Sequence, residues 1–102
     1  MVNECLYFGT SRPDGTVSDE QWTRFLAETV TPRFPDGLTH WRASGQWRSE
    51  AGIILEDSYV LNILREDTEI TDSRIAEVTA TYKKLFDQES VLRVSEKSCV
   101  TF

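Results

Sequence analysis

One histidine and two cysteines are the side chains of this sequence best suited to chemistry, but their spacing does not support a reactive site. His40 is the only imidazole, and a lone histidine needs cysteine or carboxylate partners to hold a metal or to activate a nucleophile. Cys5 and Cys99 lie near opposite ends of the chain, which excludes a Cys-x-x-Cys redox or zinc pair. We therefore predict no metal site and no cofactor, and we interpret His40 as an exposed residue on an edge strand.

A second candidate group lies in a turn bounded by prolines. Arg33 and Asp36 flank Phe34 and Pro35, and together they could bind an anion with a carboxylate beside it. An Asp before a Gly in a turn more often bonds its own backbone, and an Arg after a helix can donate to the free carbonyls at the helix end. We expect Arg33 to be structural first and a ligand-binding residue second.

A third candidate group combines two short motifs. Gln46 and Trp47 follow Gly45, and Gln88 and Ser90 follow a predicted helix. Amides, a hydroxyl and an indole could hydrogen-bond and stack on a small polar ligand, although the same groups can equally satisfy the backbone of a loop junction. In either case we predict that the two motifs contact each other.

Length and charge limit the classes of function. The chain of 102 residues is long enough for one domain, which we assign to residues 1–102. Its net charge of -6, without any run of Lys or Arg, excludes nucleic acid as an expected partner. No apolar stretch reaches the roughly 18 residues of a transmembrane segment. The first eight residues lack signal-peptide features, so we expect either a cytoplasmic protein or the mature part of an exported one.

The first half of the chain predicts a strand, a helix and a strand. Cys5 to Phe8 indicates a short buried strand, and residues 10–16 indicate a loop. Ser18 and Gln21 match a capping box, followed by an apolar stripe at helical spacing. We expect this helix to end before Pro32, because proline disfavours helical geometry at the preceding residue. The stripe consists of Trp22, Phe25, Leu26, Thr29 and Val30.

The second half predicts a hairpin, a helix and a last strand. Residues 38–48 and 53–64 alternate as strands joined by a turn at 49–52, and Gly45 suggests a bulge or a close backbone approach. We expect Trp41 in the core, as we do Trp22. Thr71 or Asp72 should begin a helix, and the last strand should run in two parts, 91–94 and 99–102, bent between them. The second helix stripe is Ile75, Val78, Tyr82, Leu85 and Phe86.

This order of elements predicts an α+β fold of the ferredoxin-like, split βαβ type. Right-handed crossovers then give a four-stranded antiparallel sheet in the order 4-1-3-2, with two helices on one face. The first and last strands are neighbours, which would place Cys5 opposite Cys99. Whether the two form a disulfide or remain thiols depends on the redox compartment.

Several segments resemble a small bacterial family known as domain of unknown function 3574. They are TPRFPDGLT at 31–39, GQW at 45–47, QESVLRV at 88–94 and the closing CVTF, and the resemblance runs nearly end to end. It implies that related proteins are often exported or lipid-anchored by a leader. It implies no activity, and the place of His40 is typically apolar in the family pattern, which argues further against catalysis.

Two functions from different classes fit this sequence. The first is a binding or structural module, in the cell envelope if a leader was removed, that uses Gln46, Trp47, Gln88 and Ser90. The second is a small enzyme of the dimeric α/β-barrel type, a homodimer in which two sheets pack through their open faces and enclose a pocket for a small molecule. A filled interface would favour the module, and an enclosed pocket would favour the enzyme.

Overall fold

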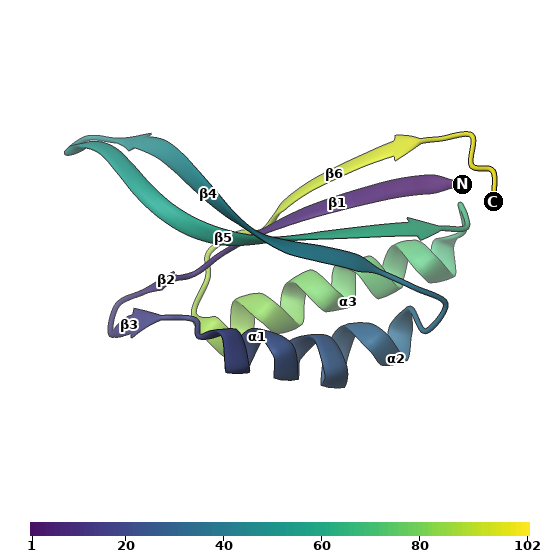
Figure 1. The fold of residues 1–102 in the computed structure, drawn as a ribbon, viewed down its shortest axis with the longest axis horizontal. Helices are drawn as coiled ribbons and strands as arrows, with labels where there is room; N and C mark the ends of the chain where they lie inside the picture. Colours follow the sequence, from purple (N-terminus) through teal and green to yellow (C-terminus); the bar gives the residue numbers. More distant parts are fainter.

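A computed structural model describes residues 1–102 as a four-stranded antiparallel sheet with its helices on one face (Figure 1). The sheet order is β4-β5-β1-β6, so the predicted ferredoxin-like fold is confirmed. Its strands are β1 (Val2–Gly9), β4 (Thr39–Ser49), β5 (Gly52–Arg65) and β6 (Leu92–Lys97), and a small separate ribbon contains β2 (Ser11–Arg12) and β3 (Gly15–Thr16). The helical segments are α1 (Asp19–Phe25), η1 (Leu26–Val30), α2 (Thr31–Arg33) and α3 (Glu69–Phe86). No helix is both long and apolar enough to cross a bilayer.

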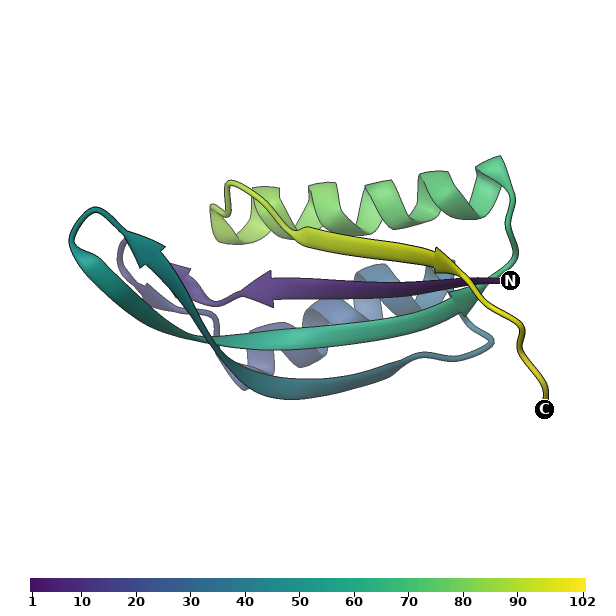
Figure 2. The ribbon, with the colours of Figure 1, turned by 90° about the horizontal axis from the view of Figure 1, so that it is seen from above.

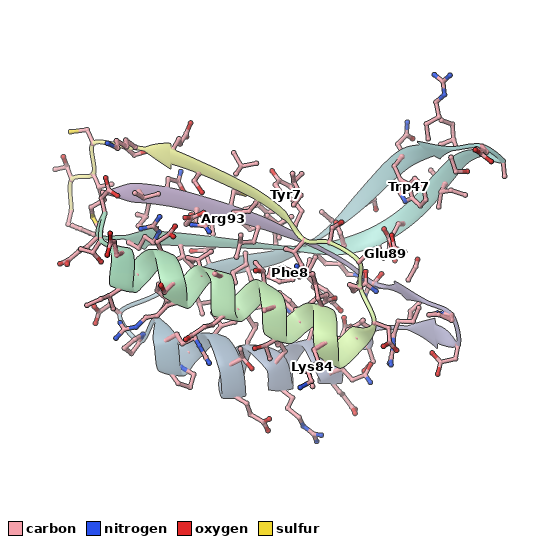
Figure 3. The ribbon with its side chains drawn as sticks, turned by 180° about the vertical axis from the view of Figure 1, so that it is seen from behind. Tyr7, Phe8, Trp47, Lys84, Glu89 and Arg93 are labelled. Carbon is pink, nitrogen blue, oxygen red and sulfur yellow. The ribbon has the colours of Figure 1, made fainter.

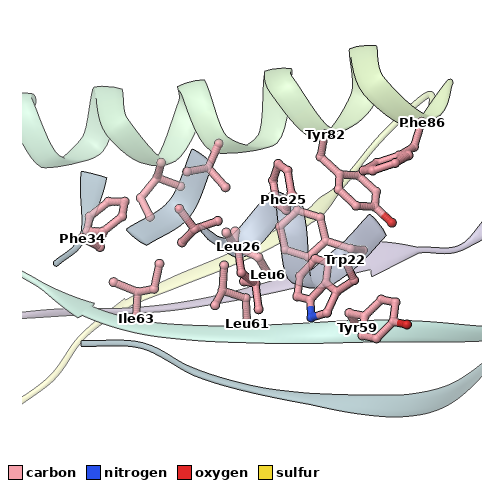
Figure 4. Close-up of a cluster of buried hydrophobic side chains, with 14 of the residues drawn as sticks. Leu6, Trp22, Phe25, Leu26, Phe34, Tyr59, Leu61, Ile63, Tyr82 and Phe86 are labelled. Atoms are coloured by element: carbon pink, nitrogen blue, oxygen red, sulfur yellow. The ribbon is translucent and has the colours of Figure 1, made fainter. Parts of the chain in front are cut away.

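The core lies between the sheet and the helices, and aromatic rings dominate one end of it (Figure 4). Trp22 stacks on Tyr59 with a centroid distance of 4.5 Å and an interplanar angle of 6°. Phe8 packs edge-on against Tyr82 at 4.6 Å. Alternate residues of β1 and β5 enter this core, as expected for strands with one covered face. Trp22 is therefore a core residue, as predicted.

The first helix begins as predicted and ends later than predicted. Ser18 and Gln21 form the reciprocal bonds of a capping box. The helix does not stop before Pro32, because Thr31 keeps right-handed helical geometry. The Thr31 N–H bonds the carbonyl of Leu26, five residues back, so the chain forms a π-helical turn. A wider turn relieves the clash that the proline ring would make with a carbonyl of the preceding turn, and the helix continues to Arg33.

The second helix begins earlier than predicted. Its N-cap is Thr68, whose hydroxyl accepts the N–H of Thr71, so neither Thr71 nor Asp72 is the cap. Leu85 is 54% exposed, unlike the other four residues of the predicted stripe, which are buried. Asp87 ends the helix in the left-handed conformation, with φ of 52°.

The strand register contradicts the prediction that Cys5 and Cys99 lie within disulfide reach. Both cysteines are free, and Cys5 is paired with Val94. Ser98, next to Cys99, donates its backbone N–H to the Met1 carbonyl at 2.8 Å. Met1 is four residues from Cys5, about 13 Å along a strand, whereas disulfide-bonded Cα atoms lie within roughly 7 Å. The cause is that β6 runs without the predicted bend, and no strand follows it.

The other face of the sheet is uncovered, and we call it the open face. In Figure 3, Tyr7 points away from the helices while its neighbour Phe8 points toward them. Trp41 lies on the open face and is 47% exposed, so the prediction that it belongs to the core is wrong. It pairs with Val60 of β5, whose side chain also lies on this face. Helices cover only one side of the sheet, and strand alternation sends Trp41 to the other side.

The hairpin of β4 and β5 extends past the rest of the sheet (Figure 2). Pairing between β1 and β5 ends at Ser58, so residues 44–57 form a two-stranded arm. The arm closes through the predicted turn, where Ser49 pairs with Gly52. Gly45 pairs regularly with Glu56, without the predicted bulge, and an added Cβ would lie an ordinary 3.5 Å from the Glu56 carbonyl.

Candidate functional site

A groove of about 690 Å³ lies at the end of the sandwich where α2 leads into β4 and β5 leads into α3. Arg33 and Asp36, predicted from the sequence as one candidate site, both line it. Its apolar surface includes Phe34, Leu38 and Leu64. The turn that carries Asp36 passes through Gly37, whose φ of +152° is a conformation that L side chains rarely adopt. The turn at Gly37 therefore places both of its neighbours, Asp36 and Leu38, at the groove.

Arg33 joins the two helical segments beside the groove. Its Nη1 donates to the Thr29 carbonyl at 2.9 Å, and its Nε donates to the Glu77 carboxylate of α3 at 2.9 Å. The expected donation to a helix-end carbonyl is therefore present. Since these partners occupy much of the guanidinium, Arg33 holds the wall of the groove in place.

Three charged side chains of the groove have no ion pair or side-chain hydrogen bond in the structure. They are Arg74 on α3, Asp36 in the turn and Glu66 after β5, and all three are exposed. The other two charged side chains that line the groove are paired, since Arg65 is buried and bonded to Glu4 and Arg33 is bonded to Glu77. Three arginines thus line the groove, of which Arg33 and Arg65 are already paired and Arg74 is free.

A buried carboxylate next to the groove was not predicted from the sequence. Glu4 is 0% exposed and accepts hydrogen bonds from Arg65 at 3.0 Å, Arg93 at 2.7 Å and Ser95 at 2.6 Å. Burial opposes ionisation, but the bonds from Arg93, Ser95 and Arg65 outweigh it and lower the Glu4 pKa below its ordinary value of 4.5. Asp72 extends this network by pairing with Arg93 at 2.6 Å.

The sequence contained a signal for this network. Val2, Leu6 and Phe8 alternate on the buried face of β1, and Glu4 occupies the position between them. Arg65 likewise continues the buried alternation of β5. Two opposite charges at buried positions of adjacent strands predict an ion pair, because an unpaired charge there would be costly.

A second polar cluster lies where α1 meets β4 and β5. The Tyr59 hydroxyl donates to Asp19, and burial together with this bond raises the Tyr59 pKa to about 12. Arg42 bridges Asp19 and Asp57, with 3.0 Å to each carboxylate. His40 is exposed, as predicted, and its Nδ1 accepts the Trp22 Nε1–H at 3.2 Å. Asp19, Tyr59, Arg42 and Asp57 form one network, the bond between Trp22 and His40 is separate, and both tie α1 to the sheet.

The motifs around Gln46 and Gln88 do not share a hydrogen bond. Gln88 donates from Nε2 to the Ser11 carbonyl at 2.7 Å and to the Phe86 carbonyl at 3.2 Å. Gln46 and Trp47 lie on the arm, where Trp47 is 53% exposed, and Ser90 is exposed without a side-chain bond. Gln46 pairs with Leu55, three residues beyond the last β1 contact at Ser58, or about 10 Å along the strand. The arm therefore carries Gln46 and Trp47 past the loop that holds Gln88.

No group of three or more His, Cys, Asp and Glu side chains is arranged to hold a metal ion. A second, mostly polar pocket of about 390 Å³ lies beside Thr10, Ser11, Ser44 and Glu56. One wall of it is fixed, since the Ser11 N–H donates to Glu56 at 2.9 Å.

The sheet order, the single helical layer and the uncovered face define a small ferredoxin-like α+β domain. The chain belongs to the family described as Protein of unknown function (DUF3574), whose model matches residues 3–102. The resemblance seen in the sequence is thereby confirmed. No curated protein is significantly similar to the chain in sequence.

Solved structures share the fold at low sequence identity. A phage SAM lyase in complex with S-methyl-5′-thioadenosine has a TM-score of 0.75 and 16% identity, over 94% of this chain and 80% of that chain. The periplasmic divalent cation tolerance protein CutA from Archaeoglobus fulgidus has a TM-score of 0.64 and 10% identity, over 98% and 87%. At3g17210 from Arabidopsis thaliana has a TM-score of 0.56 and 16% identity, over 100% and 99%. Identities this low establish the common fold alone.

Proposed function

We propose that this domain is a binding module that works as a homodimer, with the two sheets packed through their open faces. The observation that carries the proposal is one row of uncharged side chains that crosses all four strands. Trp41 pairs with Val60, Val60 with Tyr7, and Tyr7 with Leu92. Trp41, Tyr7 and Leu92 are between 40% and 60% exposed. Val60, between Trp41 and Tyr7, is 2% exposed, and the three exposed apolar side chains around it are of a kind typical of protein interfaces.

The distribution of charge favours a second copy of the chain as the partner. Each chain carries a net charge of -6, so two copies repel unless their contact surface is free of carboxylates. The central row has none, and the next row along the sheet contains Thr39, Asn62, Cys5 and Val94. The carboxylates nearest the centre of this face are Glu96, two rows away at one end, and Glu56, which reaches toward Gly9 at the other. An uncharged centre with charge at the rim suits a two-fold interface.

The alternative function, an enzyme with a pocket between two sheets, needs polar groups free to face that pocket. Asn62 is the amide nearest the central row, but it donates to Asn3 Oδ1 at 2.5 Å and to the Glu4 carbonyl at 3.0 Å. Its donors are therefore used within the chain. The uncharged row and the internally bonded Asn62 support the binding module over the enzyme.

The mass in solution tests this proposal. We expect sedimentation equilibrium at micromolar concentration to give twice the chain mass of 11.7 kDa. Tyr7→Lys should dissociate the dimer, because two-fold symmetry brings two ammonium groups into an apolar contact at a cost of several kcal/mol, or roughly a hundredfold or more in Kd. Leu92→Lys repeats the test at the edge of the sheet.

Leu85→Lys is the matched control, since Leu85 is 54% exposed but lies on the helical layer. It should leave the dimer intact. A monomeric wild type at 100 μM, or equal dissociation by Leu85→Lys, would overturn the proposal. Thermal unfolding of each variant separates loss of the dimer from loss of the fold.

A further inference from the structure

We infer that the arm binds the first residues of an extended peptide along one edge of β5, with the N-terminal ammonium of the peptide on Glu56. This inference rests on the binding-module function proposed above and names its ligand class, but it does not require the dimer. Three features of the arm support it: a strand edge without a partner, a pocket beside that edge, and a carboxylate without a cation.

The strand edge has no partner because β1 ends before the arm does. β5 pairs with β4 as far as Gly52, whereas its pairing with β1 ends at Ser58. Within the arm, β5 therefore has a neighbouring strand on one side only. None of the main-chain hydrogen bonds made outside the helices and strands involves residues 53–56.

Two residues present main-chain groups at this edge. The Asp57 carbonyl faces the side that β1 has left, since it accepts the hydroxyl of Thr10 at 2.6 Å. The main-chain groups of a strand alternate between its two edges, so Leu55 and Ile53 face the same side as Asp57. We call the N–H and C=O groups of Ile53 and Leu55 the free edge.

A pocket of about 390 Å³ lies beside the free edge, between the arm and the ribbon of β2 and β3. Arm and ribbon extend from the same end of the sheet (Figure 1). Leu55 lines the pocket from the arm, and Ser11 and Thr16 line it from the ribbon. Leu55 is 76% exposed and Ile53 57% exposed, with both side chains on one face of β5. A strand added at the free edge would bond both residues through the main chain and place its own side chains beside theirs.

The chain that follows β1 limits this site to the end of a peptide. Thr10 and Ser11 bond Asp57 and Glu56, with 2.9 Å from the Ser11 N–H to the Glu56 carboxylate, so they occupy the next positions along β5. Antiparallel pairing with β5, the more stable arrangement, gives an added strand the same direction as β1. Its first residue is then the one nearest to Ser11 and Glu56.

Glu56 is the one charged side chain of the pocket that has no ion pair. The other carboxylate, Asp57, pairs with Arg42 at 3.0 Å, and no Lys, Arg or His lines the pocket. Glu56 accepts the Ser11 N–H through Oε2, and its Oε1 has no hydrogen bond in the structure. The unpaired charge of the pocket is therefore negative, and it selects a cation.

A further acceptor lies close to the Glu56 carboxylate. Gln88 donates from its amide nitrogen to the carbonyls of Ser11 and Phe86, which leaves its Oε1 without a partner. A Cβ added to Gly9 would lie 3.1 Å from this oxygen and 3.2 Å from both carboxylate oxygens of Glu56. An ammonium group, with three N–H donors and a positive charge, fits such a group of oxygens.

Peptide probes test this inference in ¹⁵N-labelled full-length protein. The tetrapeptide Ala-Val-Thr-Val-amide has a free N-terminus, and its acetylated form differs only in that group. We expect the free form to bind about tenfold more tightly, because its ammonium makes a charge-assisted hydrogen bond. Alaninamide has the same ammonium without a strand and should bind far more weakly than the tetrapeptide.

Hydrogen exchange reports on the free edge itself. The amides of Ile53 and Leu55 should exchange rapidly in the protein alone and slow about tenfold at a tetrapeptide concentration of about ten times Kd. The amides of Ile54 and Glu56 face β4 and should change little.

Glu56→Gln keeps an acceptor for the Ser11 N–H but removes the charge, so it should abolish the preference for the free N-terminus. Glu50→Gln, at an exposed carboxylate of the same arm without an ion pair, is the matched control and should leave the preference unchanged.

Equal binding of the acetylated peptide, an unchanged preference in Glu56→Gln, or alaninamide binding as tightly as the tetrapeptide would overturn the inference. So would peptide protection at β4 or β6 instead of at Ile53 and Leu55. Protection of these two amides that rises with protein concentration, without peptide, would assign the free edge to a second copy of the chain and would equally overturn it. The sedimentation mass of the peptide-free protein reports on the dimer separately, so either idea can fail without the other.

Discussion

The carboxylate of Glu4 is held by two guanidinium groups in the interior of the domain, and removing its charge would leave both of them without their main partner. We expect Glu4→Gln to lower the free energy of unfolding by about 3–5 kcal/mol, the usual cost of breaking a buried ion pair. Chemical denaturation measures this loss. Glu89→Gln, at an exposed carboxylate without an ion pair, is the control and should change little.

The same residue predicts an acid limit to stability. Because the Glu4 pKa is lowered in the folded protein, its ionised form favours folding above the ordinary pKa of 4.5. That contribution is lost as the pH falls below 4.5 and through the folded pKa. A pH series of melting temperatures should therefore fall less steeply below pH 4.5 in Glu4→Gln than in the wild type, and parallel curves would contradict this assignment.

Gln88 and Gln46 differ in what they contact, and their variants should differ accordingly. Gln88→Ala removes two bonds to backbone carbonyls and should cost about 1 kcal/mol, whereas Gln46→Ala on the exposed arm should cost close to nothing. The double variant should show the sum of the two effects, because the side chains share no partner. If the double variant loses clearly more free energy of unfolding than the sum, Gln46 and Gln88 contact each other in a way that the hydrogen bonds do not show.

Some of these residues could be predicted and some could not. Arg33 follows a helix end, so its bond to the Thr29 carbonyl was predictable from local rules. Predicting the ion pair of Glu4 and Arg65 requires the burial alternation of both β1 and β5. Predicting the contact of Arg93 with Glu4 also requires the register of β6 on β1. The free state of Arg74 depends on three segments that meet only in the folded chain.

Among the elements, Arg33 is the clearest link between helices, because it ties the segment before β4 to α3. We expect Arg33→Ala to lower the melting temperature by a few degrees, equivalent to about 1 kcal/mol. Arg24→Ala provides the matched control. Its pair with Glu28 spans 4.0 Å between two exposed side chains, and its loss should be nearly neutral.

The elements themselves followed from periodicity, but their ends did not. The stripe from Trp22 to Val30 and the capping box at Ser18 are local patterns, and both are present. The end of the first helix depends on how a proline is accommodated, and the length of β6 depends on its pairing with β1 along its whole length. Leu85 fits a helical stripe, yet no element of the fold covers it and it is exposed.

At the scale of the whole molecule, the arm is separable from the folded body. No residue between 39 and 58 belongs to the hydrophobic core. Replacing residues 46–55 by an Asn-Gly turn should therefore leave a cooperative unfolding transition, with amide shifts outside the arm nearly unchanged. Loss of cooperativity in this variant would mean that the arm supports the sheet.

The topology was predictable because few arrangements of this element order obey right-handed crossovers and antiparallel pairing. Which residues lie on the open face was not predictable, because alternation shows which residues share a face but not which face the helices cover. Trp41 illustrates the point, since its apolar side chain fits either the core or an interface.

The π-helical turn at Leu26–Val30 contains one residue more than an α-helical turn. Deleting one of its residues would turn the five-residue bond between the Thr31 N–H and the Leu26 carbonyl into the four-residue bond of an α-helix, so Arg33 and Phe34 would keep their side of the helix. The cost of this deletion would fall on Pro32, whose ring would return to the carbonyl four residues before it. A deletion within α1 has no extra residue to remove, and it would rotate Phe34 away from the core by about 100°, one residue's share of an α-helical turn.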